Sequence, residues 1–159
     1  MRKVIGASAL AIELLAVAAC SDAPNHIPTV DSVAGSYVLT AHSGEFLVEH
    51  MGYQRVPQSI IVLGSEGSLT VQDLPAVYAI DDLRGRGRVV SGRGSWKVDD
   101  TPEGYGVELH IAKGGTMPHA VYSATSILLK GARPPYTIEF SIGDPDMRQF
   151  ITYSKKHGA

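Results

Sequence analysis

Apolar and polar residues alternate along much of the chain after residue 34, which is the pattern of half-buried β-strands. Residues 105–111 carry Tyr, Val, Leu and Ile at every second position, and residues 136–142 repeat the pattern with Tyr, Ile, Phe and Ile. Shorter alternations occupy residues 68–72 and 95–98. Because successive side chains of a strand point to opposite faces, each of these segments predicts a strand with one buried face.

Turn-forming residues separate these segments at spacings of mostly about 8 to 14 residues. Two further runs, residues 58–63 and 126–129, are apolar on both faces and predict central strands. No segment after residue 20 shows a helical period over three turns, and residues 81–94 are expected to form a long loop or a mobile hairpin. The pattern predicts an all-β domain of eight to ten strands, an antiparallel meander that forms a small barrel or a sandwich.

The first twenty residues have the pattern of an export signal. Arg2 and Lys3 precede an apolar stretch, residues 4–19, which is shorter than the roughly 20 residues that a membrane-spanning helix needs. The stretch ends in Val-Ala-Ala-Cys at residues 17–20, which resembles the lipobox of bacterial lipoproteins. The resemblance implies cleavage before Cys20 and lipidation of its thiol, and Ser21 implies the outer membrane, facing the periplasm. An ordinary secretory signal or a soluble amphipathic helix remains the alternative.

These observations divide the chain into four parts. Residues 1–19 are expected to be a lipoprotein signal peptide and residues 20–34, which lack any period, a lipid-anchored tether. Residues 35–156 form the single β domain, and residues 157–159 a C-terminal tail. The expected partner of the tether is a membrane, reached through lipidated Cys20.

Two tripeptides, Gly35-Ser36-Tyr37 and Gly94-Ser95-Trp96, resemble the Gly-x-Trp strand opening of calycins, the lipocalin-like and avidin-like barrels. The resemblance implies that the rings of Tyr37 and Trp96 pack across the closed end of a barrel. Residues 35–156, with their Gly-Asp-Pro-Asp turn, also resemble small uncharacterised bacterial lipoproteins, which implies a fold but no activity.

Composition and motifs narrow the chemistry. The formal net charge of −2 provides no basic field for nucleic acid, so none is expected as a partner. Serine-hydrolase, zinc-protease and phosphate-loop motifs are absent, and no two of the six histidines have the i, i+2 or i, i+4 spacing of a local metal site. We therefore expect no cofactor, no metal and no catalytic activity.

Two polar segments are candidate recognition sites. Arg84, Arg86, Arg88 and Arg93 are interleaved with glycines, and guanidinium groups in a pliable loop can bind carboxylate or phosphate. A solvated loop is the simpler interpretation. Asp144 and Asp146 flank a proline and form either a recognition turn or an ordinary hairpin turn.

Three classes of function stay open. The first is a lipid-anchored, non-catalytic binding module for a small apolar ligand or an envelope component. The second is a protein-interaction module, such as a periplasmic enzyme inhibitor or an immunity protein. The third is an enzyme, which would need a cleft that unites a histidine with a carboxylate and a hydroxyl.

Overall fold

The computed structural model describes residues 23–76, 87–111, 120–122, 127–142 and 149–156. Within these residues it contains two short helices and nine strands. In chain order the elements are α1 (Val30–Val33), β1 (Gly35–Leu39), α2 (Ala41–His50), β2 (Ile60–Leu63), β3 (Ser68–Pro75), β4 (Val89–Thr101), β5 (Gly104–Ile111), β6 (Ala120–Tyr122), β7 (Ile127–Lys130), β8 (Thr137–Ser141) and β9 (Phe150–Lys155).

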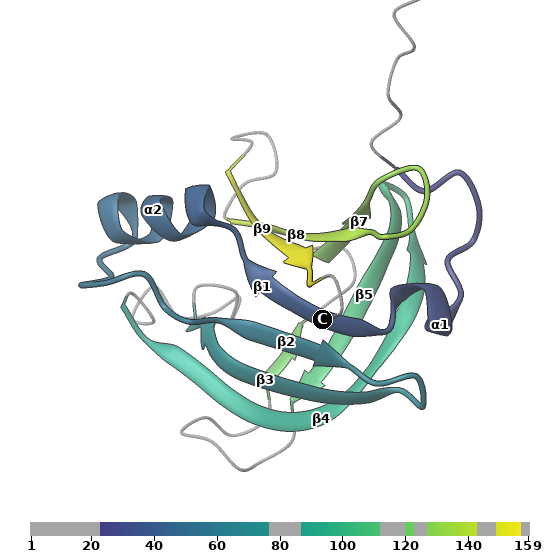
Figure 1. Cartoon of the computed structure of the whole chain (residues 1–159), viewed down its shortest axis with the longest axis horizontal. Coiled ribbons are helices and arrows are strands. Elements are labelled where there is room, and N and C mark those ends of the chain that lie inside the picture. The colour runs from purple at the N-terminus through teal and green to yellow at the C-terminus, as the bar shows by residue number, and fades with distance from the viewer. Residues whose placement is uncertain (1–22, 77–86, 112–119, 123–126, 143–148, 157–159) are drawn as a thin grey trace, which may run out of the picture.

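Eight of the strands close into an antiparallel barrel (Figure 1). Each strand pairs with its neighbour in the chain from β1 to β5 and from β7 to β9, while β5 pairs with β7 and β9 returns to β1. Strand β6 pairs with the end of β5 beside β7. The predicted all-β antiparallel meander is therefore confirmed, and it forms a barrel rather than a sandwich.

The alternation of the sequence sets the inner and outer faces of the barrel. In β5, Val107, Leu109 and Ile111 are buried, whereas Glu108 and His110 between them are partly exposed. Large side chains occupy the interior, and the rings of Phe140 and Tyr153 lie 5.4 Å apart. Burial of these apolar side chains is the main driving force for closing the sheet.

The expectation of a loop or mobile hairpin at residues 81–94 is wrong for the end of that segment. Strand β4 begins at Val89, and Gly92 and Arg93 pair with Val71 and Thr70 of β3. Gly92 and Gly94 weaken the strand pattern in the sequence because glycine has no side chain that would mark one face of the strand as apolar or polar. Pairing with β3 nonetheless holds this stretch in the sheet.

A ten-residue helix, α2, was not expected from the sequence. Its apolar residues Phe46, Leu47 and Val48 are consecutive, so they show no helical period, and only Leu47 among them is fully buried. Thr40 caps the helix by accepting a hydrogen bond from Ser43 N. The Ser43 hydroxyl in turn accepts the N–H of Thr152 at 2.9 Å, which fixes α2 to β9.

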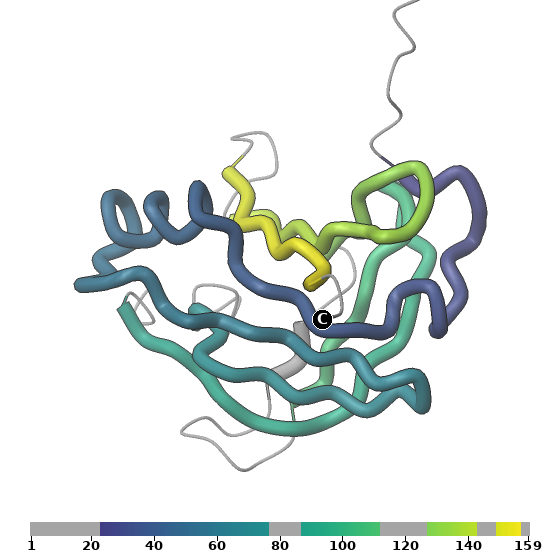
Figure 2. Tube along the Cα trace, in the orientation of Figure 1, coloured from purple at the N-terminus to yellow at the C-terminus, as the bar shows by residue number. Residues whose placement is uncertain are grey.

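Because the strands alternate in direction, their first and last residues lie at two ends of the barrel, and α1 and α2 lie at opposite ends (Figure 2). We call one end the closed end; it comprises residues 23–34, the turns at 64–67, 102–103 and 131–136, and the last residues of β9. We call the other end the mouth; it comprises α2, residues 51–59 and the strand ends that flank residues 77–86, 112–119 and 143–148.

The N-terminal segment of the described chain lies against the closed end. Pro24 and Pro28 are buried, and the N–H of Asn25 donates to the carbonyl of Ala132 at 3.2 Å. Residues 23–34, which the sequence assigned to a tether, are thus docked on the barrel. Of the helices in the described part of the chain, none has the length and apolar character required to span a bilayer.

Tyr37 and Trp96 also lie at the closed end, and both are buried. Gly35 opens β1 as expected, whereas Gly94 lies inside β4, which begins at Val89, so the resemblance to a strand opening is wrong there. The Tyr37 hydroxyl donates to the carbonyl of Val33 at 2.6 Å, and the Trp96 indole N–H donates to the carbonyl of Gly64 at 2.9 Å. Burial raises the pKa of the Tyr37 hydroxyl well above its ordinary value, so this hydroxyl remains a donor. Both rings therefore tie strands to the covering of this end.

Candidate functional site: a cleft at the mouth

A cleft of about 880 Å³ opens at the mouth, between the chain leading into β2 and the neighbouring ends of β3 and β4. Its volume is within the usual range of ligand sites in proteins. Unlike the apolar interior of the barrel, its lining is mixed. It is formed by Gly52, Tyr53, Gln54, Arg55, Val56, Pro57, Gln58, Asp73, Gly87 and Val89.

The two walls of the cleft meet at Tyr53 and Gly87. The buried Tyr53 donates its hydroxyl proton to the carbonyl of Arg88 at 2.6 Å, and the same carbonyl accepts the N–H of Ala76 at 2.9 Å. Gly87 has a φ of +75°, and a Cβ at this position would lie 2.9 Å from the carbonyl oxygen of Gly52. The close approach of the walls therefore requires glycine at residue 87.

On the β3 side of the cleft, Asp73 forms a bend in the backbone. Its φ of +48° is the only positive value among the described non-glycine residues, and the β3–β4 register shifts between Val71 and Leu74. The Ser91 hydroxyl accepts the N–H of Asp73 at 2.9 Å and holds the bend. Such strain and such bulges gather at functional sites, where they redirect a side chain.

The bend ends the pairing of β3 with β2 beside the cleft. The β2–β3 ladder ends at the pair Ile60–Gln72, whereas β3 continues to Pro75 and pairs only with β4 through Leu74 and Pro75. Across the cleft, no described residue forms a hydrogen bond with the backbone of residues 54–58. The backbone of residues 54–58 thus presents groups that an extended chain could pair with, and Asp73 faces it across the cleft.

The rim supplies charge and apolar surface. Val56 and Val89 are 47% and 39% exposed, although valine is usually buried. Arg55 is also exposed, and Asp73 contributes a carboxylate on the facing wall. The cleft can therefore contact apolar side chains, amide groups and charges of both signs at once.

The structure separates the predicted arginine cluster. Arg88 is exposed beside the cleft, whereas Arg93 is exposed on the outer wall of β4, five residues further and hence about 17 Å along an extended chain. Arg84 and Arg86 lie outside the described residues, as do Cys20, Asp144 and Asp146.

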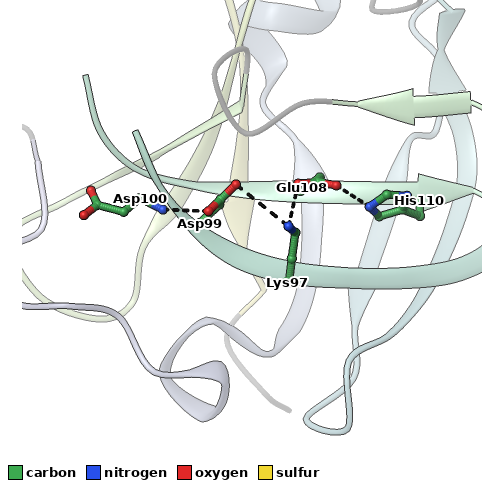
Figure 3. Close-up of polar contacts among 5 residues, drawn as sticks. All are labelled: Lys97, Asp99, Asp100, Glu108 and His110. Atoms are coloured by element: carbon green, nitrogen blue, oxygen red, sulfur yellow. Dashed lines mark hydrogen bonds and ion pairs between the residues drawn. The ribbon is translucent and has the colours of Figure 1, made fainter. Parts of the chain in front are cut away.

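A second polar group, the outer-wall cluster, is formed by Lys97 and Asp99 of β4 and Glu108 and His110 of β5 (Figure 3). Lys97 Nζ lies 2.9 Å from Glu108 Oε2 and 4.0 Å from Asp99, while His110 Nε2 contacts Glu108 Oε1. The N–H of Asp100 donates to Asp99 Oδ1 at 3.1 Å. The hydrogen bond from Lys97 holds the pKa of Glu108 below its ordinary value, and Glu108 raises that of Lys97.

Beside the outer-wall cluster lies Ser95, the cross-strand partner of His110, so a hydroxyl, a histidine and the carboxylate of Glu108 are near one another. This arrangement lacks the geometry of a nucleophilic site, however. No hydrogen bond joins Ser95 to His110 among the described residues, the histidine uses Nε2 for Glu108, and the cluster lies outside the cleft. The contacts are those expected of cross-strand pairing on an exposed face.

Within the residues described, no group of three or more His, Cys, Asp or Glu side chains could hold a metal ion. The cleft itself was not predicted from the sequence. One signal was present, because Asp73 interrupts an apparent strand and aspartate is depleted in strands. No residue pattern in the sequence indicates that residues 54–58 are separated from β3.

Comparison of the chain with protein-family models, with curated proteins and with solved structures finds no match.

Proposed function

We propose that this chain is a lipid-anchored lipoprotein of the cell envelope, a non-catalytic module that binds an extended peptide segment of an envelope component in the cleft. Lipidation of Cys20 would hold it in the outer membrane, facing the periplasm. The observation that carries the proposed binding is the backbone of residues 54–58, which forms no hydrogen bond with any described residue and faces Asp73 across the cleft.

The distribution of apolar surface favours a peptide over a small apolar ligand. Inside the barrel, bulky side chains such as Tyr37, Phe140 and Tyr153 are buried. The cleft instead combines backbone groups with Val56, Val89 and the charges of Arg55 and Asp73. A strand added to an open sheet edge gains affinity from main-chain hydrogen bonds and specificity from alternate side chains.

The peptide could come from a cell-wall stem peptide or from an envelope protein, and the second source corresponds to an inhibitor-like interaction module. The chemistry of the site is the same for both. Binding should therefore be measured with purified stem peptides in one arm and with linear peptides selected from a random display library in the other.

The decisive measurement is nuclear magnetic resonance of the isotopically labelled mature chain during each titration. Bound peptide should shift the amides of residues 54–56, 58 and 73 and should newly protect those of residues 54–56 and 58. Val56→Asp should abolish binding, whereas Val62→Asp, on the outer wall of β2 and 41% exposed, should bind normally. Failure of both arms, or full binding by Val56→Asp, would refute the proposed ligand.

The proposed anchor has a separate test. Cells expressing the full chain should incorporate labelled fatty acid into the protein, and Cys20→Ser should abolish that incorporation. A mature protein that retains a free thiol at Cys20 would refute the anchor without affecting the binding measurement.

A further inference from the structure

The closed end carries two apolar side chains that the barrel leaves uncovered. Ile27 is 73% exposed, the largest value among the described large apolar residues, and Val30 is 39% exposed. Both belong to the segment 23–34 that is docked on the barrel. Isolated exposed apolar residues are common on soluble proteins, so their meaning depends on where this segment is held.

The docking contacts fix that segment relative to the barrel. Val33 is fully buried, and its carbonyl accepts the Tyr37 hydroxyl. Lys155 Nζ, at the end of β9, donates to the carbonyl of Ser32 at 3.1 Å and lies 5.9 Å from the centre of the Tyr37 ring. Together with the hydrogen bond from Asn25 to Ala132, these contacts hold Ile27 and Val30 at the surface of the closed end.

The chain between the expected anchor and this segment is very short. Only residues 21 and 22 separate Cys20 from Ala23, the first described residue, so the two Cα atoms are at most about 11 Å apart. The polar layer on each side of a bilayer is about 5–8 Å thick. If acyl chains on Cys20 enter the bilayer, the closed end must lie at or near the headgroups.

We infer that the closed end rests on the membrane, with Ile27 and Val30 inserted among the lipid headgroups, so that the cleft faces away from the bilayer. This inference rests on the proposed lipid anchor at Cys20. Exposed charges at this end have both signs, with Asp31, Glu66 and Glu103 against Arg133 and Lys156. Apolar contact and the anchor, rather than attraction to anionic lipid, therefore supply the orientation.

The single cysteine of the chain provides a direct test. Once Cys20 is acylated, Ile27→Cys and Val30→Cys each introduce a unique thiol, and so do the control variants Val56→Cys at the cleft and Val62→Cys on the outer wall. Val62 and Val56 are 41% and 47% exposed, which matches Val30 closely. Each lipidated variant is placed in nanodiscs of phosphatidylethanolamine and phosphatidylglycerol, and its rate of reaction with a membrane-impermeant maleimide is measured.

The reference for each variant is the same protein carrying Cys20→Ser, free in solution. We expect nanodiscs to slow the reaction several-fold at residues 27 and 30 and to leave it unchanged at residues 56 and 62. The same change of rate, relative to its reference, at all four residues in protein that co-elutes with nanodiscs would overturn the orientation and leave the anchor intact. Protein that fails to co-elute with nanodiscs would overturn both.

Discussion

The closed end and the mouth differ in how the chain uses its polar backbone groups. At the closed end, Tyr37 and Trp96 donate their hydroxyl and indole protons to the backbone of the segments that cover the core. At the mouth, the backbone of residues 54–58 forms no hydrogen bond with any described residue. One end therefore contributes chiefly stability, and the other leaves groups available for binding.

The two ends also differ in how far their apolar side chains are exposed. Trp96 is 4% exposed and closes the core, whereas Val56 and Val89 remain partly in water at the rim of the cleft. Keeping apolar side chains exposed forgoes the free energy of burial, roughly 25 cal/mol for each Å². A ligand that covers these valines would recover that free energy.

The largest effect should come from removing the indole at the closed end. Trp96→Ala loses a large buried side chain and its hydrogen bond to Gly64, and it should lower the free energy of unfolding by about 3–5 kcal/mol. Val56→Ala at the mouth should lower it by about 1 kcal/mol or less, because Val56 is 47% exposed, although its side chain also packs against Gly44 of α2. Chemical denaturation of both variants measures the difference, and similar losses would contradict the division between the two ends.

Tyr37 at the closed end and Tyr53 at the mouth allow the stability contributed by one hydrogen bond to be compared between the two ends. Tyr37 and Tyr53 both donate to a backbone carbonyl at 2.6 Å. Tyr37→Phe leaves the buried carbonyl of Val33 without this donor and should cost about 1–3 kcal/mol of unfolding free energy. Tyr53→Phe should cost about 1 kcal/mol or less, because the carbonyl of Arg88 keeps the N–H of Ala76.

For peptide affinity we expect the reverse order, with the larger loss in the Tyr53 variant. Tyr53→Phe should weaken the binding of any peptide ligand identified for the cleft, because residue 53 is no longer hydrogen-bonded to Arg88 across the cleft, whereas Tyr37→Phe should bind normally once folded. Calorimetric titration measures both affinities. Equal affinities for the two variants would show that the Tyr53 contact does not shape the cleft.

Two glycines test how closely the walls of the cleft must approach. Gly52 and Gly87 have nearly equal positive φ values, +74° and +75°, so alanine at either should cost about 1–2 kcal/mol through the backbone alone. A Cβ at residue 52 meets nothing within 4 Å, whereas one at residue 87 approaches the Gly52 carbonyl. Gly87→Ala should therefore lower the midpoint of thermal unfolding more than Gly52→Ala; equal shifts would contradict the close contact.

The sequence predicts the strands whose two faces differ in polarity. In β5 and β8 every second residue is apolar, and the structure pairs both strands as expected. It does not predict that β4 begins at residue 89, because the glycines of this segment are neither apolar nor polar side chains and so break the alternation. It does not predict α2 either, because the packing of this helix depends on a single fully buried leucine and on the contact of Ser43 with a strand 109 residues away. Local patterns cannot report contacts that exist only after the barrel has closed.

The same limit applies to the site. The arginine cluster is conspicuous in the sequence, but an extended strand carries Arg93 away from Arg88. The cleft depends instead on the backbone of Asp73 and on the path of residues 54–58, and neither creates a motif. The docking of residues 23–34 at the closed end could not be predicted either, because their hydrogen-bond partner Ala132 lies far along the chain.

The smallest effect should come from the wall that joins the two ends, where Lys97 lowers the pKa of Glu108. A lowered pKa in the folded state means that the ionised carboxylate stabilises the fold above its ordinary pKa of about 4.3. This contribution disappears as the pH falls through the lowered folded-state value, because Glu108 is then protonated in both states. The contribution should also weaken with added salt, since both partners are partly exposed.

Glu108→Gln should therefore lower the unfolding midpoint slightly at about pH 7, and the difference from the parent protein should vanish at low pH. Glu103→Gln, in the exposed β4–β5 turn, provides the control for removing one negative charge. Thermal unfolding at a series of pH values measures both variants. A difference for Glu108→Gln that persists below the lowered pKa, or that exceeds the loss in Tyr37→Phe, would show that the wall rather than the closed end dominates the stability of the barrel.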